Sequence, residues 1–124
     1  MTKRILVVED QEDNRAILRD LLAAAGYVYL EAVSGADGVA AAERERPDLI
    51  LMDIQLPEID GYEATRRIKT NPALRAIPII AVTSYALSGD EAKARAAGCD
   101  DYVTKPFSPR QLLAKMREFL PDSG

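Results

Sequence analysis

Three short segments of the chain consist of apolar residues without interruption, and they constrain the fold more than any other feature. They are I-L-V-V at 5–8, L-I-L-M at 49–52 and I-I-A-V at 79–82. A strand with one face in water alternates apolar and polar residues, whereas a strand covered on both faces reads as a continuous apolar run. With two further apolar segments, at 28–33 and 102–104, the pattern predicts five strands of a parallel sheet.

Segments with helical patterns lie between the predicted strands. Apolar residues recur at helical spacing in the first and the last of them: Ile17, Leu18, Leu21, Leu22 and Ala25, then Leu112, Leu113, Met116, Phe119 and Leu120. Four helix starts pair a capping residue with an acid or amide three positions later: Ser34/Asp37, Asp60/Glu63, Ser88/Glu91 and Ser108/Gln111. Right-handed crossovers then give a doubly wound α/β sheet of five strands and five helices.

Polar residues follow four of the five predicted strands. Glu9 and Asp10 come after the first strand, Asp53 after the third, Thr83 after the fourth and Lys105 after the fifth. The second strand ends without a charged residue, and a flavodoxin-like strand order of 2-1-3-4-5 explains this by placing that strand at an edge. Sites in such sheets lie beyond the carboxyl ends of the strands. The sequence therefore predicts that these five side chains converge.

The composition narrows the chemistry that such a site can perform. The chain has 124 residues, no histidine and one cysteine, Cys99. These counts exclude a Ser-His-Asp triad, His-ligated metals and an internal disulfide framework. A formal net charge of −4 without a basic run argues against a nucleic-acid partner. No apolar stretch approaches the roughly 20 residues of a membrane span, and no signal-peptide core is present, so we expect a cytoplasmic protein with no membrane partner.

Three converging carboxylates, those of Glu9, Asp10 and Asp53, would repel one another unless a cation lies between them. A site without histidine or cysteine suits a hard ion that prefers oxygen ligands, and Mg²⁺ fits best. Lys105 adds a second positive charge and Thr83 a hydroxyl donor. Together these groups form a receptacle for a phosphoryl group, in which Asp53 would be the nucleophile and form an aspartyl phosphate.

Each of these residues also has an ordinary structural interpretation. Asp10 could cap the first helix, with Asp13 at the third helical position, and Asp53 could be a turn residue before Pro57. The remaining side chains could be structural or solvated at the surface. The functional interpretation is favoured because all four strand ends carry suitable groups together.

With these residues the sequence resembles the response-regulator receiver domains, the phosphoacceptor half of two-component signalling, and in particular their single-domain DivK-like and CheY-like members. The resemblance spans the whole chain. It rests on V-V-E-D at 7–10, D-L-I-L-M-D-I-Q-L-P at 48–57, D-G at 60–61, A-V-T-S at 81–84 and A-G-C-D-D-Y-V-T-K-P at 97–106. It implies one receiver domain over residues 1–124 with no effector domain.

The resemblance implies a role for each matching position. Asp53 would be the phosphoacceptor, and Mg²⁺ would be bound by Asp53, by Asp10 directly, by the backbone carbonyl of Gln55, and by Glu9 through water. Thr83 would turn toward the phosphoryl oxygens. Tyr102 would swing inward with the switch, Lys105 would pair with the phosphoryl group, and the bond before Pro106 would be cis.

The implied function is Mg²⁺-dependent phosphoryl transfer from a phosphohistidine of a histidine kinase or histidine phosphotransfer protein to Asp53. The chain would not be an enzyme, apart from its own phosphorylation and dephosphorylation. The donor would dock on the first helix, including Asn14, Arg15 and Leu18, and on the loop after Pro106. The face of the fourth helix, fifth strand and fifth helix would bind a protein target or a second copy of the chain.

Other functions remain open at this point. The chain could be a pseudo-receiver that binds partners without being phosphorylated, or a receiver fragment of a hybrid histidine kinase. A haloacid-dehalogenase-type phosphatase is disfavoured because that class requires D-x-D, whereas residues 53–55 read D-I-Q. Nucleotide binding is disfavoured because the turn after the first strand lacks a glycine-rich phosphate loop. Cys99 is interpreted as a small buried apolar residue in preference to a redox group.

Overall fold

The computed structural model describes residues 2–84 and 90–120. The strands are β1 (Arg4–Val8), β2 (Val28–Ala32), β3 (Leu49–Asp53), β4 (Ile79–Thr83) and β5 (Asp101–Thr104). The helices are α1 (Glu12–Ala24), α2 (Gly35–Glu45), α3 (Gly61–Lys69), α4 (Asp90–Ala97) and α5 (Pro109–Phe119). Each strand begins and ends within one residue of its predicted bounds. For β1, β3 and β4 the reason is that the continuous apolar runs coincide with strand residues buried on both faces.

The five strands form one parallel sheet in the order β2-β1-β3-β4-β5, which confirms the predicted fold. Pairing of Asp53 with Val82, and of Thr83 with Thr104, brings the carboxyl ends of the strands to one edge. This edge is where the polar residues of the sequence analysis lie.

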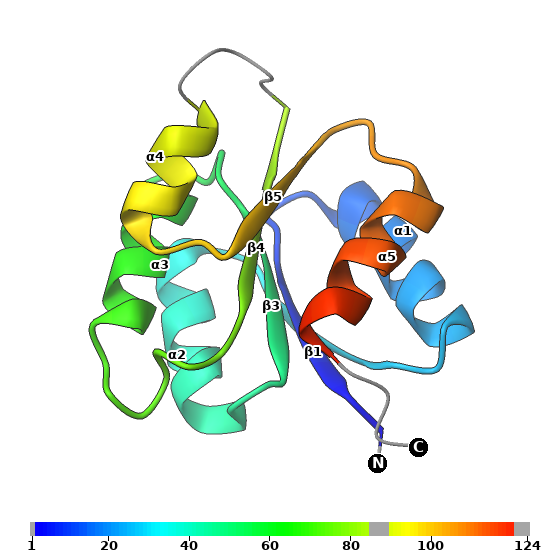
Figure 1. The fold of residues 1–124 in the computed structure, drawn as a ribbon, viewed down its shortest axis with the longest axis horizontal. Helices are drawn as coiled ribbons and strands as arrows, with labels where there is room; N and C mark the ends of the chain where they lie inside the picture. Colours follow the sequence, from blue (N-terminus) through cyan, green and yellow to red (C-terminus); the bar gives the residue numbers. More distant parts are fainter. Residues whose placement is uncertain (1, 85–89, 121–124) are drawn as a thin grey trace.

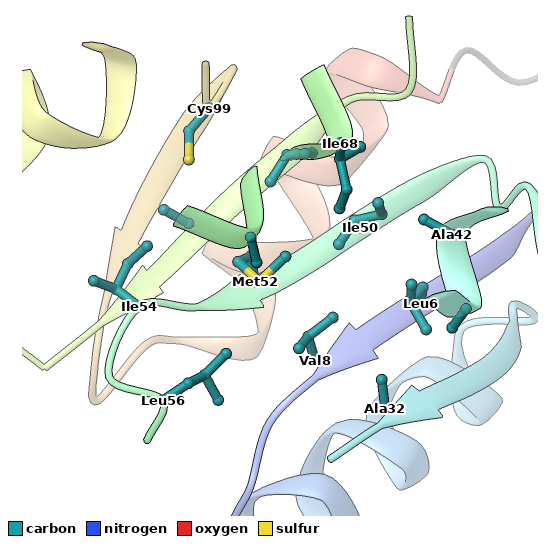
Figure 2. Packing of buried hydrophobic residues seen from close by; sticks show 14 of the residues in the cluster. Leu6, Val8, Ala32, Ala42, Ile50, Met52, Ile54, Leu56, Ile68 and Cys99 are labelled. Carbon is teal, nitrogen blue, oxygen red and sulfur yellow. The ribbon is translucent and has the colours of Figure 1, made fainter. Parts of the chain in front are cut away.

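The sheet separates two layers of helices, and each layer packs on its own apolar cluster. Figure 1 shows α1 and α5 on one side of the sheet and α2, α3 and α4 on the other. Alternate residues of β1 enter the two clusters: Leu6 and Val8 pack with α2, α3 and α4, whereas Ile5 and Val7 pack with α1 and α5. Figure 2 shows part of the first cluster, in which Met52 lies among side chains from several elements.

Side-chain caps begin three of the helices as predicted. The hydroxyls of Ser34 and Ser108 and the carboxylate of Asp60 each accept a hydrogen bond from the backbone N–H three residues later. The fourth predicted cap, Ser88, lies outside the described residues. None of the described helices has the length and apolar character needed to cross a membrane.

Helical spacing of apolar residues does not place all of them in the core. Ile17 is 59% exposed and Ala25, just after α1, is exposed, whereas Leu18 and Leu22 are buried. The apolar stripe of α1 is wider than the surface that the sheet covers, so that Ile17 is left at its margin.

Candidate phosphoacceptor site

Three carboxylates gather at the carboxyl edge of the sheet. Glu9 and Asp10 follow β1, and Asp53 is the last residue of β3. One oxygen atom from each side chain can be chosen so that all three lie within 4.8 Å of one another. Glu9 is 2% exposed and Asp53 is 4% exposed, while Asp10 is half-buried. The convergence follows from the pairing of β1 with β3, which brings residues more than forty positions apart to the same edge.

The ordinary structural interpretation of Asp10 is wrong. The residue that caps α1 is Gln11, whose side chain makes no capping hydrogen bond. The Gln11 backbone N–H instead donates to Oε2 of Glu9 at 3.1 Å. Asp10 therefore faces the carboxylate cluster without serving as a helix cap.

Asp53 combines a local bond with a place in the cluster. Its Oδ1 accepts a hydrogen bond from the backbone N–H of Gln55 at 3.1 Å, as a turn residue would. This bond also holds residue 55 beside the cluster. The start of α3 packs closely against the same region. A side chain at position 61 would collide with the backbone of Asp53 and Ile54, so this contact requires Gly61.

Lys105 lies across the site from the carboxylates. Its ammonium donates to Oε1 of Glu9 at 3.0 Å and lies 3.6 Å from Oδ2 of Asp53. The Lys105 backbone N–H donates to the carbonyl of Thr83 at 2.7 Å, which aligns the end of β5 with the end of β4. The peptide bond between Lys105 and Pro106 is cis.

The charges of this cluster fit a divalent cation. The cluster of Glu9, Asp10 and Asp53 brings three negative charges together. Among the described residues, the side chain that forms ion pairs with this cluster is that of Lys105, which supplies one positive charge. Burial makes the remaining repulsion costly, because the charges are shielded from water. All of the available donor atoms are oxygens, the ligands that Mg²⁺ prefers. Asp10, Asp53 and the carbonyl of Gln55 could hold such an ion, with Glu9 close enough to act through water.

Thr83 and Tyr102 lie on the same face of the sheet. Thr83 ends β4 and is 3% exposed. Tyr102 of β5 is opposite Ala81, two residues before Thr83, so both side chains point toward the layer of α4. Tyr102 is half-buried and packs against the cluster that contains Ala94 of α4. The two residues thus share the face of the sheet that α4 covers.

A hollow of about 400 Å³ opens beside the carboxylates. It is lined by Glu9, Asn14, Ile17, Leu18, Ser84, Lys105, Pro106 and Phe107. The exposed side chain of Ile17 therefore belongs to the rim of this hollow, and α1 meets the loop after β5 there. Of the residues expected on the docking face, Arg15 is 9% exposed and adds little surface to it. Leu18 is 4% exposed, so it contributes only a small part of the hollow's surface.

Two contacts at the site could not be read from the sequence. Oε1 of Gln55 accepts a hydrogen bond from the backbone N–H of Ser84 at 3.4 Å, which links the end of β3 to the residue after β4. Arg15 donates from Nη1 to the backbone carbonyl of Glu9 at 2.9 Å. Arg15 does not interrupt the apolar spacing of α1. No other feature of the sequence indicates that it lies next to the carboxylates.

Known proteins are similar to this chain in sequence and in architecture. The family model described as the response regulator receiver domain matches residues 5–117. The polar-differentiation response regulator DivK of Brucella ovis is 44% identical over 123 residues, which is 99% of this chain and 100% of that protein. DivK of Brucella anthropi is 43% identical over the same share of both chains.

Solved structures agree with these relatives. The receiver domain of the sensor histidine kinase PA1611 from Pseudomonas aeruginosa, described with a magnesium ion coordinated in its active site cleft, has a TM-score of 0.90 and 39% identity, covering 97% of this chain and 98% of that one. The chemotaxis protein CheY4 of Vibrio cholerae has a TM-score of 0.90 and 25% identity, covering 96% and 99%. The chain therefore belongs to the response regulator receiver domain family.

Proposed function

We propose that this protein is the phosphoacceptor of a two-component phosphorelay, with Asp53 as the residue that receives the phosphoryl group. The observation that carries the proposal is the position of the Asp53 carboxylate. It is 4% exposed, shares a cluster with Glu9 and Asp10, and has the Lys105 ammonium 3.6 Å away. A carboxylate placed among further oxygen ligands and a lysine is equipped to bind a metal ion and a phosphoryl group together.

In the proposed reaction, a carboxylate oxygen of Asp53 forms a bond to phosphorus while the bond from phosphorus to the donor's histidine nitrogen breaks. The electron pair of the broken bond stays on the imidazole, which takes a proton from water. Mg²⁺ held by Asp10, Asp53 and the Gln55 carbonyl, with Glu9 through water, would neutralise charge on the phosphoryl oxygens. Lys105 would exchange its bond with Glu9 for one with the phosphoryl group.

The phosphoryl group would act as a switch because it adds close to two negative charges at Asp53. Thr83 can supply a hydroxyl donor to the new oxygens, and a movement of Thr83 changes the packing beside Tyr102. Since both side chains point toward the layer of α4, the change would reach the face formed by α4, β5 and α5. We propose that this face binds a target protein or a second copy of the chain.

The donor would dock at the hollow beside Lys105. Asn14, the exposed Ile17 and Phe107 surround its opening and offer apolar area next to the acidic cluster. A kinase or phosphotransfer protein could thereby place its phosphohistidine over Asp53. A donor whose kinase or phosphotransfer domain faces the cytoplasm would meet the protein there, so we place the protein in the cytoplasm.

The test is incubation of the chain with acetyl phosphate and Mg²⁺, followed by intact mass measurement. We expect one added phosphoryl group on the wild type and none on Asp53→Ala, and no addition when Mg²⁺ is removed with a chelator. Glu58→Ala, which changes an exposed acid on the same loop, is the matched control and should be phosphorylated normally. Wild-type protein that stays unmodified with every small donor and every histidine kinase of the host would instead identify a pseudo-receiver.

A second candidate has support from one relative. The PA1611 receiver domain, 39% identical, is described as part of a sensor histidine kinase. If this chain has the same role, a kinase should transfer phosphate to Asp53 within the same polypeptide. Phosphotransfer profiling separates the two cases, because a stand-alone regulator receives phosphate from a separate kinase or phosphotransfer protein.

A further inference from the structure

Arg15 is a buried cation next to the carboxylate cluster, and the proposed reaction does not use it. It lies on α1 and is 9% exposed. Nη2 donates to Oε2 of Glu12 at 2.7 Å, and Nη1 donates to the backbone carbonyl of Glu9 at 2.9 Å. Nε lies 3.7 Å from Oε1 of Glu31 on β2 and makes no hydrogen bond with any described residue. One guanidinium thus touches the helix, the edge strand and the end of β1.

These contacts hold the Glu9 backbone from both sides. The Glu9 N–H donates to the carbonyl of Ala32 on β2 at 3.0 Å, and the Glu9 carbonyl accepts from Arg15. That carbonyl belongs to the planar peptide unit that also contains the nitrogen of Asp10. Fixing the carbonyl therefore fixes the plane from which the Asp10 side chain extends.

The chemistry of the contact requires arginine. A guanidinium presents donors in a rigid fork, so it can bind the Glu9 carbonyl and the Glu12 carboxylate at once, whereas an ammonium is a point charge on a flexible stem. Burying a cation with an unbonded Nε is costly, and a purely structural role could be filled by an apolar side chain of similar size. The position is thus better explained by what the Nη1 contact does for the site than by stability alone.

The geometry points to Arg15 as a positioning residue for the metal site: it orients the Glu9–Asp10 peptide so that Asp10 presents its carboxylate to Mg²⁺. The inference rests on the proposed function, since it assumes that the carboxylate cluster binds Mg²⁺. Mg²⁺ demands near-ideal octahedral geometry, whereas Ca²⁺ accepts flexible arrangements of oxygen ligands. Loss of the Arg15 contact should accordingly weaken Mg²⁺ binding more than Ca²⁺ binding.

The experiment titrates the full chain with Mg²⁺ and with Ca²⁺ and follows the backbone amide signals of Asp10 and Asp53 by NMR. Arg15→Lys keeps the charge and loses the fork, and Arg15→Met fills the same space without a charge. We expect the Mg²⁺ dissociation constant of both variants to rise about tenfold, and that of Ca²⁺ to rise by less than about threefold. Arg19→Lys is the matched control, because Arg19 pairs with the same Glu12 but has no contact with Glu9.

The ratio of the Mg²⁺ to the Ca²⁺ dissociation constant distinguishes a positioning role of Arg15 from a loss of stability in the variants. Partial unfolding of a variant would raise both constants by one factor and leave their ratio unchanged. An unchanged ratio in both Arg15 variants, or an equal change in Arg19→Lys, overturns the inference. Wild-type protein that shows no Mg²⁺-dependent signal change overturns the proposed metal site itself, so the two failures are distinguishable.

Discussion

The ammonium of Lys105 donates a hydrogen bond of 3.0 Å to the carboxylate of Glu9, although 96 positions separate the two residues in the chain. The Glu9 side chain is 2% exposed and that of Lys105 is 21% exposed. This bond places the lysine charge where a metal ion bound by the cluster would also be attracted. The ammonium and the metal therefore compete for the same carboxylates.

The competition predicts that Lys105→Met binds Mg²⁺ more tightly than the wild type. Removing the ammonium leaves the three carboxylates without their ion-pair partner, so a divalent cation gains more by entering. We expect the dissociation constant to fall about tenfold, or about 1.4 kcal/mol. Titration followed by NMR measures it, with Lys115→Met, which pairs with Asp101 away from the cluster, as the control. An unchanged or weaker Mg²⁺ affinity would contradict this account of the charges.

Helix α4 is predicted to be less protected from hydrogen exchange than α1 and α5. Its buried side chains among the described residues are Ala94 and Ala97, whereas α5 buries Leu112 and Met116. Because α4 buries less apolar area against the sheet than α5 does, opening α4 costs less free energy. We expect α4 amides to exchange at least about tenfold faster than those of the α5 core in native-state exchange followed by NMR. Equal protection would remove the argument that α4 is easily shifted.

Lys69 supports the connection from α3 to β4 and its loss should be costly. Its ammonium donates to Oδ2 of Asp100 at 2.9 Å and to the carbonyl of Ile77 at 2.7 Å. The Lys69→Met variant leaves the Asp100 carboxylate without this partner. We expect a loss of about 2–3 kcal/mol in the free energy of unfolding, less than for a fully buried pair because Asp100 keeps contact with water. Urea denaturation measures it, and the exposed Lys93→Met should stay within about 0.5 kcal/mol of the wild type.

Cys99 should be an unreactive thiol in the folded protein. Burial raises the pKa of Cys99 above its ordinary value, and the neighbouring Asp100 charge acts in the same direction. The reactive thiolate is therefore scarce at neutral pH, and the residue is only 5% exposed. At pH 8 we expect a thiol reagent to react at least about tenfold more slowly with the native protein than with the urea-unfolded chain, and the native rate to rise as pH increases. Comparable rates would reopen a redox role.

Most of the fold could be predicted because one physical signal dominates it. Strands buried on both faces must be apolar throughout, and β3 and β4 were located by that requirement alone. The absence of a charged residue at the end of β2 agreed with a flavodoxin-like order, which places that strand at an edge. The exposure of Ile17 could not be predicted, because helical spacing marks an apolar stripe but does not say how much of its width the sheet covers.

Part of the candidate site could also be predicted from the sequence, and part could not. The convergence of Glu9, Asp10, Asp53 and Lys105 could be predicted, since strand ends in a parallel sheet meet at one edge. Contacts made through the backbone could not be, because the sequence does not say which carbonyl a long side chain will reach. Arg15 is the clearest example: a charged residue on a helix is expected at the surface, and only the fold shows the Glu9 carbonyl that it binds.

The strand order also governs when a newly made chain acquires its chemistry. Synthesis runs from the amino terminus and a domain generally folds as a unit, so Glu9 and Asp53 are made first but are brought together only when the whole domain folds. Lys105 follows β5, the last strand to emerge and an edge of the sheet. The balance of charge that a phosphoryl group requires therefore depends on the last strand, and it exists only once β5 has joined the sheet and brought Lys105 to Glu9.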